Sequence, residues 1–243
     1  MRLLSFSKRT ALEILRDPLN IVFGLGFPVI LLLLLSAIQA NVPVEIFVIE
    51  SLAPGMTVFG LAFMTLFSAT IISKDRESAL FARLLTTPLT AFDFILGYTL
   101  PILPIALIQG VVCYSVAMAL GMDFSTNIII ALFMNIPACV LFVSIGLLCG
   151  SVLNTKQVGG LCGALLTNLT AWFSGIWFDI ELVGGVFKKI ADVLPFIHAV
   201  ELQRNVCAGN FAEALPDLIW VMGYAVAILV LSVVVFIKRK KAV

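Results

Sequence analysis

The sequence has a single histidine, His198, which precedes Glu201 and Arg204 by three and six residues. On a helix, this spacing brings the three side chains to one face. Such a group suits a gate or a contact with a substrate. It also suits an ion-pair cluster that seats a short helix at a membrane interface, and this interpretation is favoured because structural ion-pair networks are common.

The other titratable residues do not form a catalytic set. Catalysis needs several convergent titratable groups, and the long apolar stretches of this chain contain no Asp, Glu, Lys, Arg or His. The five cysteines show no paired spacing, so neither a disulfide framework nor a metal site is implied. The chain also lacks a GxxxxGK(S/T) phosphate-binding loop. We therefore predict no catalytic residues, no metal and no cofactor bound by this chain.

Six apolar stretches dominate the chain, in which 61% of the residues are hydrophobic and 12% are charged. An average soluble domain has about 25% charged residues. Each stretch is long enough to cross the roughly 30 Å hydrocarbon core of a bilayer. The sequence therefore predicts one all-α integral membrane domain over residues 1–243 with six transmembrane helices. The predicted spans are residues 20–38, 54–73, 94–120, 127–150, 158–178 and 218–237.

The basic residues indicate how these spans are oriented. All but Lys188, Lys189 and Arg204 of the fifteen basic residues fall on one side of a six-span topology. Short loops rich in Lys and Arg remain in the cytoplasm. We therefore expect a multi-pass plasma-membrane protein with both termini in the cytoplasm. Because no basic patch with interleaved aromatic residues is present, the sequence argues against binding of nucleic acid.

Two segments on the cytoplasmic side are patterned beyond simple loops. Residues 2–17 form an amphipathic helix that is expected to lie in the lipid headgroup region, with a break at Asp17-Pro18. Residues 74–92 form the largest internal loop and predict a short helix. Asp75 and Glu77 are expected near the start of that helix, as the helix dipole favours.

A third segment, residues 179–217, lies between the last two predicted spans. It is too polar to cross the membrane and too apolar for a free external loop. Two short re-entrant helices in the outer leaflet, with their irregular backbone buried in protein, satisfy both properties. Leu194-Pro195 is the expected break between them. The predicted third span contains Pro101 and Pro104, which favour a kink.

The predicted fifth span carries two further candidate residues for a gate or substrate contact. Asn168 suits a hydrogen bond between helices, the more frequent use of such residues in membranes, and also suits a pathway for an amphipathic substrate. Trp172 belongs to an aromatic cluster at the outer end of the span. An interface belt explains this cluster, although a lipophilic cargo would also find stacking surface there.

The order of these features resembles the membrane subunit (permease) of type-2 ABC transporters, the ABC-2 family, over nearly all 243 residues. Two motifs carry the resemblance. Glu77, Arg83, Leu84, Leu85 and Pro88 of the first motif stand where the family has them. The motifs are Lys74-Asp-Arg-Glu-Ser-Ala-Leu-Phe-Ala-Arg-Leu-Leu-Thr-Thr-Pro88 and Leu194-Pro-Phe-Ile-His-Ala-Val-Glu-Leu-Gln-Arg204.

The resemblance implies that residues 74–92 hold a coupling helix seated on a separate ATP-binding subunit, with residues 2–17 as a connecting helix beside it. ATP and Mg²⁺ would bind that partner subunit. A second permease copy would complete a homodimer, or a related permease a heterodimer, surrounded by membrane lipid. The cargo would be a small lipophilic compound that is exported. The implied ATPase-coupling residues are Lys74, Asp75, Arg76, Glu77, Phe81, Arg83, Leu84 and Pro88.

Two other functions remain open from the residues alone. A gradient-driven carrier or channel would need an ion-responsive residue, and the candidates lie outside the spans. A membrane assembly or immunity scaffold would need no ATPase. Because ionisable residues inside a membrane usually mark ion paths, their absence from the apolar stretches favours an energy source outside the bilayer.

Overall fold

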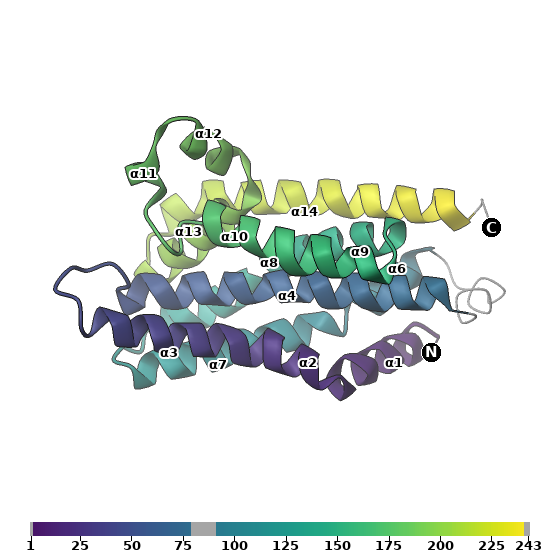
Figure 1. Ribbon diagram of the computed structural model, residues 1–243, viewed down its shortest axis with the longest axis horizontal. Coiled ribbons are helices and arrows are strands. Elements are labelled where there is room, and N and C mark those ends of the chain that lie inside the picture. The colour runs from purple at the N-terminus through teal and green to yellow at the C-terminus, as the bar shows by residue number, and fades with distance from the viewer. Residues whose placement is uncertain (1, 79–90, 241–243) are drawn as a thin grey trace.

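Long helices run side by side along one axis of the protein in the computed structural model, which describes residues 2–78 and 91–240 (Figure 1). Every regular element in these residues is a helix. The first helix, α1 (Arg2–Arg16), lies at the end of the bundle where the last helix, α14 (Phe211–Lys240), finishes. We call this end the terminal end and the opposite end the distal end.

Five helical stretches among the described residues are long and apolar enough to cross a membrane. They coincide with five of the six predicted spans, and the all-α membrane class is confirmed. The stretches are Val22–Gln39 (the π-helix η1, Val22–Gly26, and α3, Phe27–Gln39), α4 (Ile49–Glu77), Asp93–Ala119 (in α6, Ala91–Thr99, and α7, Ile102–Ala119), α8 (Thr126–Val152) and Phe211–Lys238 in α14.

The remaining predicted span, the fifth (residues 158–178), is not among these five stretches. Its helical part consists of three consecutive pieces, α9 (Thr155–Val158), the π-helix η2 (Gly159–Leu166) and α10 (Thr167–Phe173). Polar Thr155, Lys156 and Gln157 form the first turn, which lowers the hydropathy of the whole stretch. Because α8 ends at the terminal end and α14 begins at the distal end, these pieces carry the chain back along the bundle (Figure 1). Their crossing of the membrane stays a prediction.

Helix α4 forms the centre of the bundle, and every residue from Leu52 to Thr65 is buried. Helix α8 packs closely against it because glycines face its backbone. A Cβ atom on Gly146 would lie 2.6 Å from the Thr65 carbonyl oxygen, and one on Gly150 would lie 2.7 Å from that of Ala69. Small residues at such positions let membrane helices approach closely.

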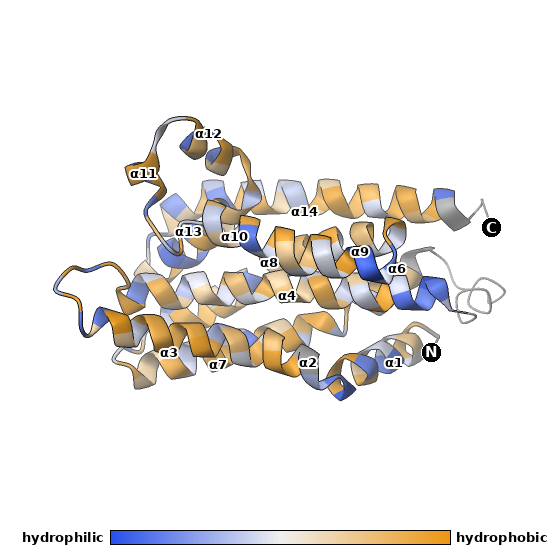
Figure 2. Ribbon diagram, in the orientation of Figure 1, coloured by the Kyte–Doolittle hydropathy of each residue, from blue (hydrophilic) through white to orange (hydrophobic). Residues whose placement is uncertain are grey.

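Hydrophobic residues dominate the middle of the long helices, whereas hydrophilic residues gather in α1 and at the terminal end of α4 (Figure 2).

Two predicted breaks in the chain are confirmed. Helix α1 ends at Arg16, and the short helix α2 (Pro18–Ile21) follows Asp17. Helices α6 and α7 are separated at Leu100-Pro101, where a kink was expected.

The distal segment contains three short helices rather than the two predicted, because the chain turns at Gly184, whose φ is +61°. They are α11 (Ile180–Val183), α12 (Gly185–Val193) and α13 (Pro195–Ala208). The break at Leu194-Pro195 is confirmed. The prediction was wrong for residues 211–217, which belong to α14, because the helix extends past its apolar stretch. The chain turns at Gly209, whose φ of +82° suits glycine, and α14 then runs beside α13 (Figure 1). Insertion of these helices into the outer leaflet stays a prediction.

Candidate functional site

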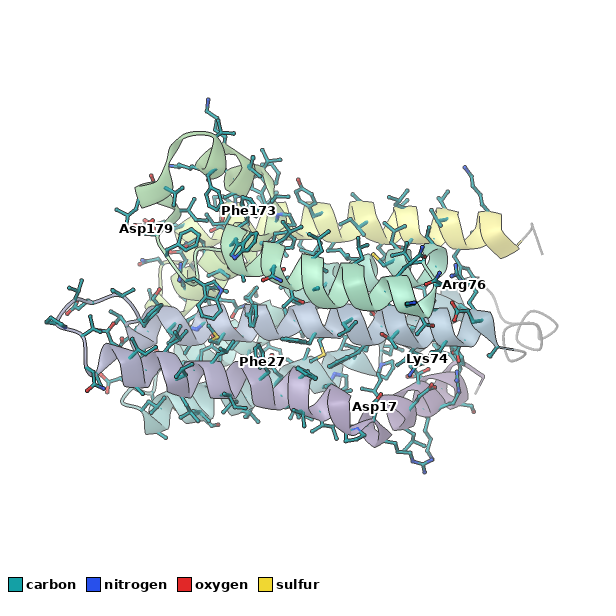
Figure 3. All side chains as sticks on the ribbon, in the orientation of Figure 1. Asp17, Phe27, Lys74, Arg76, Phe173 and Asp179 are labelled. Carbon is teal, nitrogen blue, oxygen red and sulfur yellow. The ribbon has the colours of Figure 1, made fainter. Side chains whose placement is uncertain are left out.

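The terminal end of α4 differs from the prediction for residues 74–92. Asp75 and Glu77 lie in the last turns of α4 rather than at the start of a separate loop helix. Carboxylates are disfavoured there, because the last carbonyl groups of a helix carry partial negative charge. The basic side chains of Lys74 and Arg76 lie in the same region (Figure 3). Both acids also have specific partners from other elements, which offset the unfavourable position.

Asp75 joins three helices through one carboxylate. Its residue surface is only 3% exposed. The guanidinium of Arg9 in α1 donates two hydrogen bonds to the two carboxylate oxygens, both at 2.6 Å. The hydroxyl of Tyr98 in α6 donates a third at 2.8 Å, and Glu13 pairs with Arg9 at 2.8 Å. Bidentate pairs of this kind are stronger than ordinary hydrogen bonds and fix the orientation of both groups.

Apolar packing beside this carboxylate holds α1 against α6. The ring of Phe6 lies 5.3 Å from that of Phe94 and 5.0 Å from that of Tyr98, centroid to centroid. A Cβ atom on Gly97 would lie 2.1 Å from the Phe6 ring, so only glycine permits this approach. Leu4, on the other hand, is exposed and faces away from the bundle. Helix α1 therefore packs one face on protein and exposes apolar Leu4 on another face.

Arg76 and Glu77 contact the connection between α8 and α9. Arg76 donates hydrogen bonds to the carbonyl oxygens of Ser151 and Leu153, where α8 ends. Such contacts satisfy carbonyl groups that have no partner within the helix. Glu77 accepts hydrogen bonds from the backbone N–H (3.0 Å) and the hydroxyl (2.9 Å) of Thr155. This carboxylate lies at the N-terminus of α9, where negative charge is favourable.

We call Arg9, Asp75, Arg76, Glu77 and Tyr98 the α4 junction, because neighbouring residues of one helix end contact α1, α6, α8 and α9. Lys74 is exposed. The other predicted coupling residues, Phe81, Arg83, Leu84 and Pro88, lie outside the described residues. The sequence analysis missed Arg9 and Tyr98. The only available signal was a basic residue on the polar face of α1, which does not identify a partner.

At the distal end, the structure divides the predicted group of His198, Glu201 and Arg204. Arg204 pairs with Glu201 at 2.8 Å and donates to the carbonyl oxygens of Gly175 (2.9 Å) and Ser51 (3.2 Å). It thereby connects α13 with the start of α4 and the turn after α10. His198 instead lies 2.7 Å from Asp217 of α14, a residue that the sequence analysis did not single out.

The structure separates Asn168 and Trp172 from the distal ion pairs. Both line a groove of about 490 Å³ between η1, α3, α4 and α10. Its volume lies in the range of small-molecule sites, and the Asn168 amide donates to the Ala164 carbonyl oxygen at 2.8 Å. A second cavity, of about 870 Å³ and lined partly by Glu201 and Arg204, opens at the distal end. The groove is lined mainly by the aromatic residues Phe23, Phe27, Phe59, Phe63, Trp172, Trp177 and Phe178.

A bundle of membrane-length helices with a charged junction at one end defines a multi-pass membrane protein. Groups of three or more His, Cys, Asp or Glu that could hold a metal are absent from the part of the chain that the structure describes. The model of the ABC-2 type transporter family matches residues 1–207, and the chain belongs to that family. The family resemblance drawn from the sequence is therefore confirmed.

Curated relatives agree with this assignment. The chain is 22% identical over 181 residues to the probable multidrug ABC transporter permease YbhR of Escherichia coli strain K12. The alignment covers 74% of this chain and 48% of that relative. The YbhR protein of Escherichia coli O157:H7 matches with the same identity and coverage. The chain thus spans about half the length of the curated relatives it matches.

Proposed function

We propose that this chain is the permease subunit of an ATP-driven exporter for a small lipophilic compound. The α4 junction is the observation that carries this proposal. It joins the end of the central membrane helix to four other elements, and it includes the first residues of the segment 74–92, where the family resemblance places the contact with the ATPase. Force applied there reaches the bundle through Asp75, Arg76 and Glu77.

The junction suits this role because its contacts are directional and strong. A bidentate Arg–carboxylate pair resists sliding and rotation better than apolar packing does. Coupling between distant sites requires an element with two discrete arrangements that both sites bias. In our proposal, α4 and the helices joined to it form this element, and nucleotide binding by the ATPase shifts its position. Phe81, Arg83, Leu84 and Pro88 would contact the ATPase, and ATP and Mg²⁺ would bind there.

The same proposal sets the orientation in the plasma membrane. The terminal end faces the cytoplasm, in line with the basic residues on that side, and the stretch Thr155–Phe173 supplies the sixth crossing. Export is proposed from the family resemblance and from the description of YbhR as a multidrug permease.

A second permease copy would complete the transporter. The groove beside Trp172 supports this part of the proposal, because Trp172 is 52% exposed and lines an open aromatic surface. An exposed Asn168 on the same helix is unfavourable against lipid and gains a partner at a helix interface. Two copies facing each other would enclose an aromatic-lined pathway for a lipophilic cargo. A homodimer is the simplest arrangement.

The contact with the ATPase can be tested by site-specific photocrosslinking in the native host. A benzoylphenylalanine residue replaces Phe81, and a control chain carries it at Asp123, an exposed position between α7 and α8. We expect a crosslink from position 81 to a protein that azido-ATP labels, and none from position 123. Equal crosslinking from both positions, or none to a nucleotide-binding protein, would contradict the proposal.

Two outcomes would point to the alternative functions. Solute flux through the chain reconstituted alone, abolished by collapse of the proton gradient, would indicate a gradient-driven carrier. A chain that assembles with other membrane proteins but never with an ATPase would indicate a scaffold.

A further inference from the structure

His198 joins three helices at the distal end. Its Nδ1 atom lies 2.7 Å from the Asp217 carboxylate of α14. Its Nε2 atom lies 2.9 Å from the backbone carbonyl oxygen of Asp192 at the end of α12. The imidazole also stacks in parallel on Trp220 of α14, with ring centroids 5.0 Å apart. The side chains of His198 and Asp217 are only 16% and 15% exposed, so water has little access to this contact.

The partners of the two ring nitrogens determine how many protons this site holds. A backbone carbonyl oxygen only accepts hydrogen bonds, so Nε2 must carry a hydrogen. An ionised carboxylate also only accepts, so a contact of 2.7 Å between Nδ1 and Asp217 needs another hydrogen. That hydrogen resides on Nδ1, giving an imidazolium beside a carboxylate, because an imidazole is ordinarily a stronger base than a carboxylate. The pair therefore holds one proton more than a neutral histidine and an ionised aspartate.

We propose that His198 and Asp217 form a proton-binding site that locks α12 and α14 to α13, and that loss of its proton unlocks them. Without the proton, a lone pair on Nδ1 would face the lone pairs of the Asp217 carboxylate. The contact then breaks, either by rotation of the ring, which releases Asp192, or by separation of α13 and α14. This function lies beyond the proposed coupling to an ATPase and does not depend on it.

The charged groups around the site favour the protonated state. Burial disfavours the imidazolium, but the hydrogen bonds to Asp217 and to the Asp192 carbonyl oxygen, and the charges of both carboxylates, outweigh it. The pKa of His198 is therefore raised above 6.5. Among the charged residues nearby, Glu201 on α13 is engaged by Arg204, and Lys188 on α12 by Glu181.

Two neutral groups complete the surroundings of the site. Tyr224 of α14 donates its hydroxyl hydrogen to the Val193 carbonyl oxygen at 2.7 Å, and Asn205 of α13 lies 3.5 Å from the second Asp217 oxygen. The Tyr224 contact keeps the end of α12 near α14 when the proton leaves. Deprotonation is therefore expected to loosen the distal helices rather than to unfold them.

The lock affects the distal cavity of about 870 Å³, because Asp192 and Glu201 both line it. The position of α12 sets one wall of this cavity. A medium that removes the proton would therefore change the shape of the cavity on the distal side of the protein.

The proton site can be observed directly, because His198 is the only histidine of the chain. The full chain is purified through a tag without histidine, labelled with ¹⁵N-histidine and placed in lipid nanodiscs. We expect the ¹⁵N shifts of a doubly protonated ring at pH 6.5, and a titration midpoint above the ordinary value of 6.5. A singly protonated ring at pH 6.5, or a midpoint at or below that value, would overturn the proposal without any variant.

Matched variants assign the effect to the Asp217 carboxylate. In Asp217→Asn, the titration midpoint of His198 should fall by about one pH unit or more. It should stay unchanged in Asp123→Asn, because Asp123 is an exposed aspartate in the loop between α7 and α8. Equal midpoints in the wild type and Asp217→Asn would overturn the assignment.

Fluorescence of Trp220 gives a second readout, because the stacked imidazolium quenches it. The fluorescence should rise as the pH passes through the same midpoint, and this rise should vanish in Trp220→Phe. A rise that persists in Trp220→Phe would contradict the stacked geometry.

Discussion

The two ends of the bundle hold a carboxylate in opposite ways. Asp75 lies at the C-terminal end of α4, against the helix dipole, and is bound by Arg9, a cation at every physiological pH. Asp217 lies in the second turn of α14, beyond the first turn where the helix dipole acts, and is bound by His198, which gains and loses its charge. The terminal junction is therefore permanent and the distal contact conditional. This difference suits a protein that receives force at one end and rearranges at the other.

The largest expected effect is at Asp75. In Asp75→Ala, Arg9 and Tyr98 lose their shared partner, and we expect a loss of about 3 kcal/mol, at the low end for broken buried pairs because Arg9 is partly exposed. Chemical denaturation in detergent measures this loss as a lower free energy of unfolding. A double-mutant cycle with Arg9→Gln should return a coupling energy above about 1 kcal/mol. Additive effects of the two substitutions would show that the pair is not the source of stability.

The next largest effect concerns the packing of α1. Gly97→Ala places a methyl group against the Phe6 ring, and we expect a destabilisation of about 2 kcal/mol from overpacking. Limited proteolysis should then release α1 more readily. In a Phe6→Ala background, Gly97→Ala should cost much less, because the atoms nearest to the added methyl group belong to the Phe6 ring. An equal cost in both backgrounds would mean that α1 does not pack on α6 as described.

At the distal end, Arg204→Lys should have a smaller effect. Lysine cannot reproduce the separate hydrogen bonds from the guanidinium to Glu201, Gly175 and Ser51. We expect a loss of about 1–2 kcal/mol, seen as faster hydrogen exchange around Gly175 and at the start of α4. Exchange at α1 should be unchanged. Equal acceleration at both ends would contradict the independence of the two regions.

The ends should also differ in their response to pH. The folded-state pKa of His198 is raised, so its contribution to stability is complete below 6.5, the unfolded value, and disappears as the pH rises through the folded value. Hydrogen exchange of α12, corrected for its intrinsic pH dependence, should therefore accelerate over that range. Exchange of α1 should show no such step, because Arg9 stays protonated. Exchange that accelerates with pH at α1 but not at α12 would contradict the proposed difference between the two ends.

The smallest effect is expected at Glu77. Its bonds to Thr155 lie near the surface, so Glu77→Gln should cost only about 0.5 kcal/mol of stability. Glu45→Gln, in the exposed loop before α4, is the matched control and should be neutral. A loss of several kcal/mol in Glu77→Gln would mean that this contact, rather than Asp75, dominates the junction.

The sequence predicted the parts of the fold that depend on local patterns. Apolar runs gave five membrane-length helices, and the prolines at positions 18, 101 and 195 marked breaks that the structure contains. The fifth predicted span is not among these five helices. Its helix begins with the polar turn from Thr155, and this turn lowers the mean hydropathy of the whole helix. The extension of α4 to Glu77 was missed for a related reason, since charge ended the apolar pattern before the helix ended.

The sites were harder to predict than the spans, because their partners are distant in sequence. Arg9 and Asp75 are 66 residues apart, and no periodicity relates them. His198, Glu201 and Arg204 were predicted to share one helical face. In the structure, His198 instead contacts Asp217, which belongs to the next helix, α14. Helical spacing states which side chains share a face but not which neighbouring helix that face will meet. Residues 79–90 lie outside the described part of the chain, so the predicted contacts of Phe81, Arg83, Leu84 and Pro88 stay predictions.

The most direct test of the account is a distance measurement across the assembled transporter. A spin label replaces Glu45 in each permease copy of a variant without native cysteines, and the distance between copies is measured without nucleotide and after vanadate trapping of ADP. We expect trapping to change this distance when Asp75 is present and to leave it unchanged in Asp75→Asn, although the ATPase still binds and traps nucleotide. The same change of distance in both proteins would contradict the claim that the α4 junction transmits the motion of the ATPase.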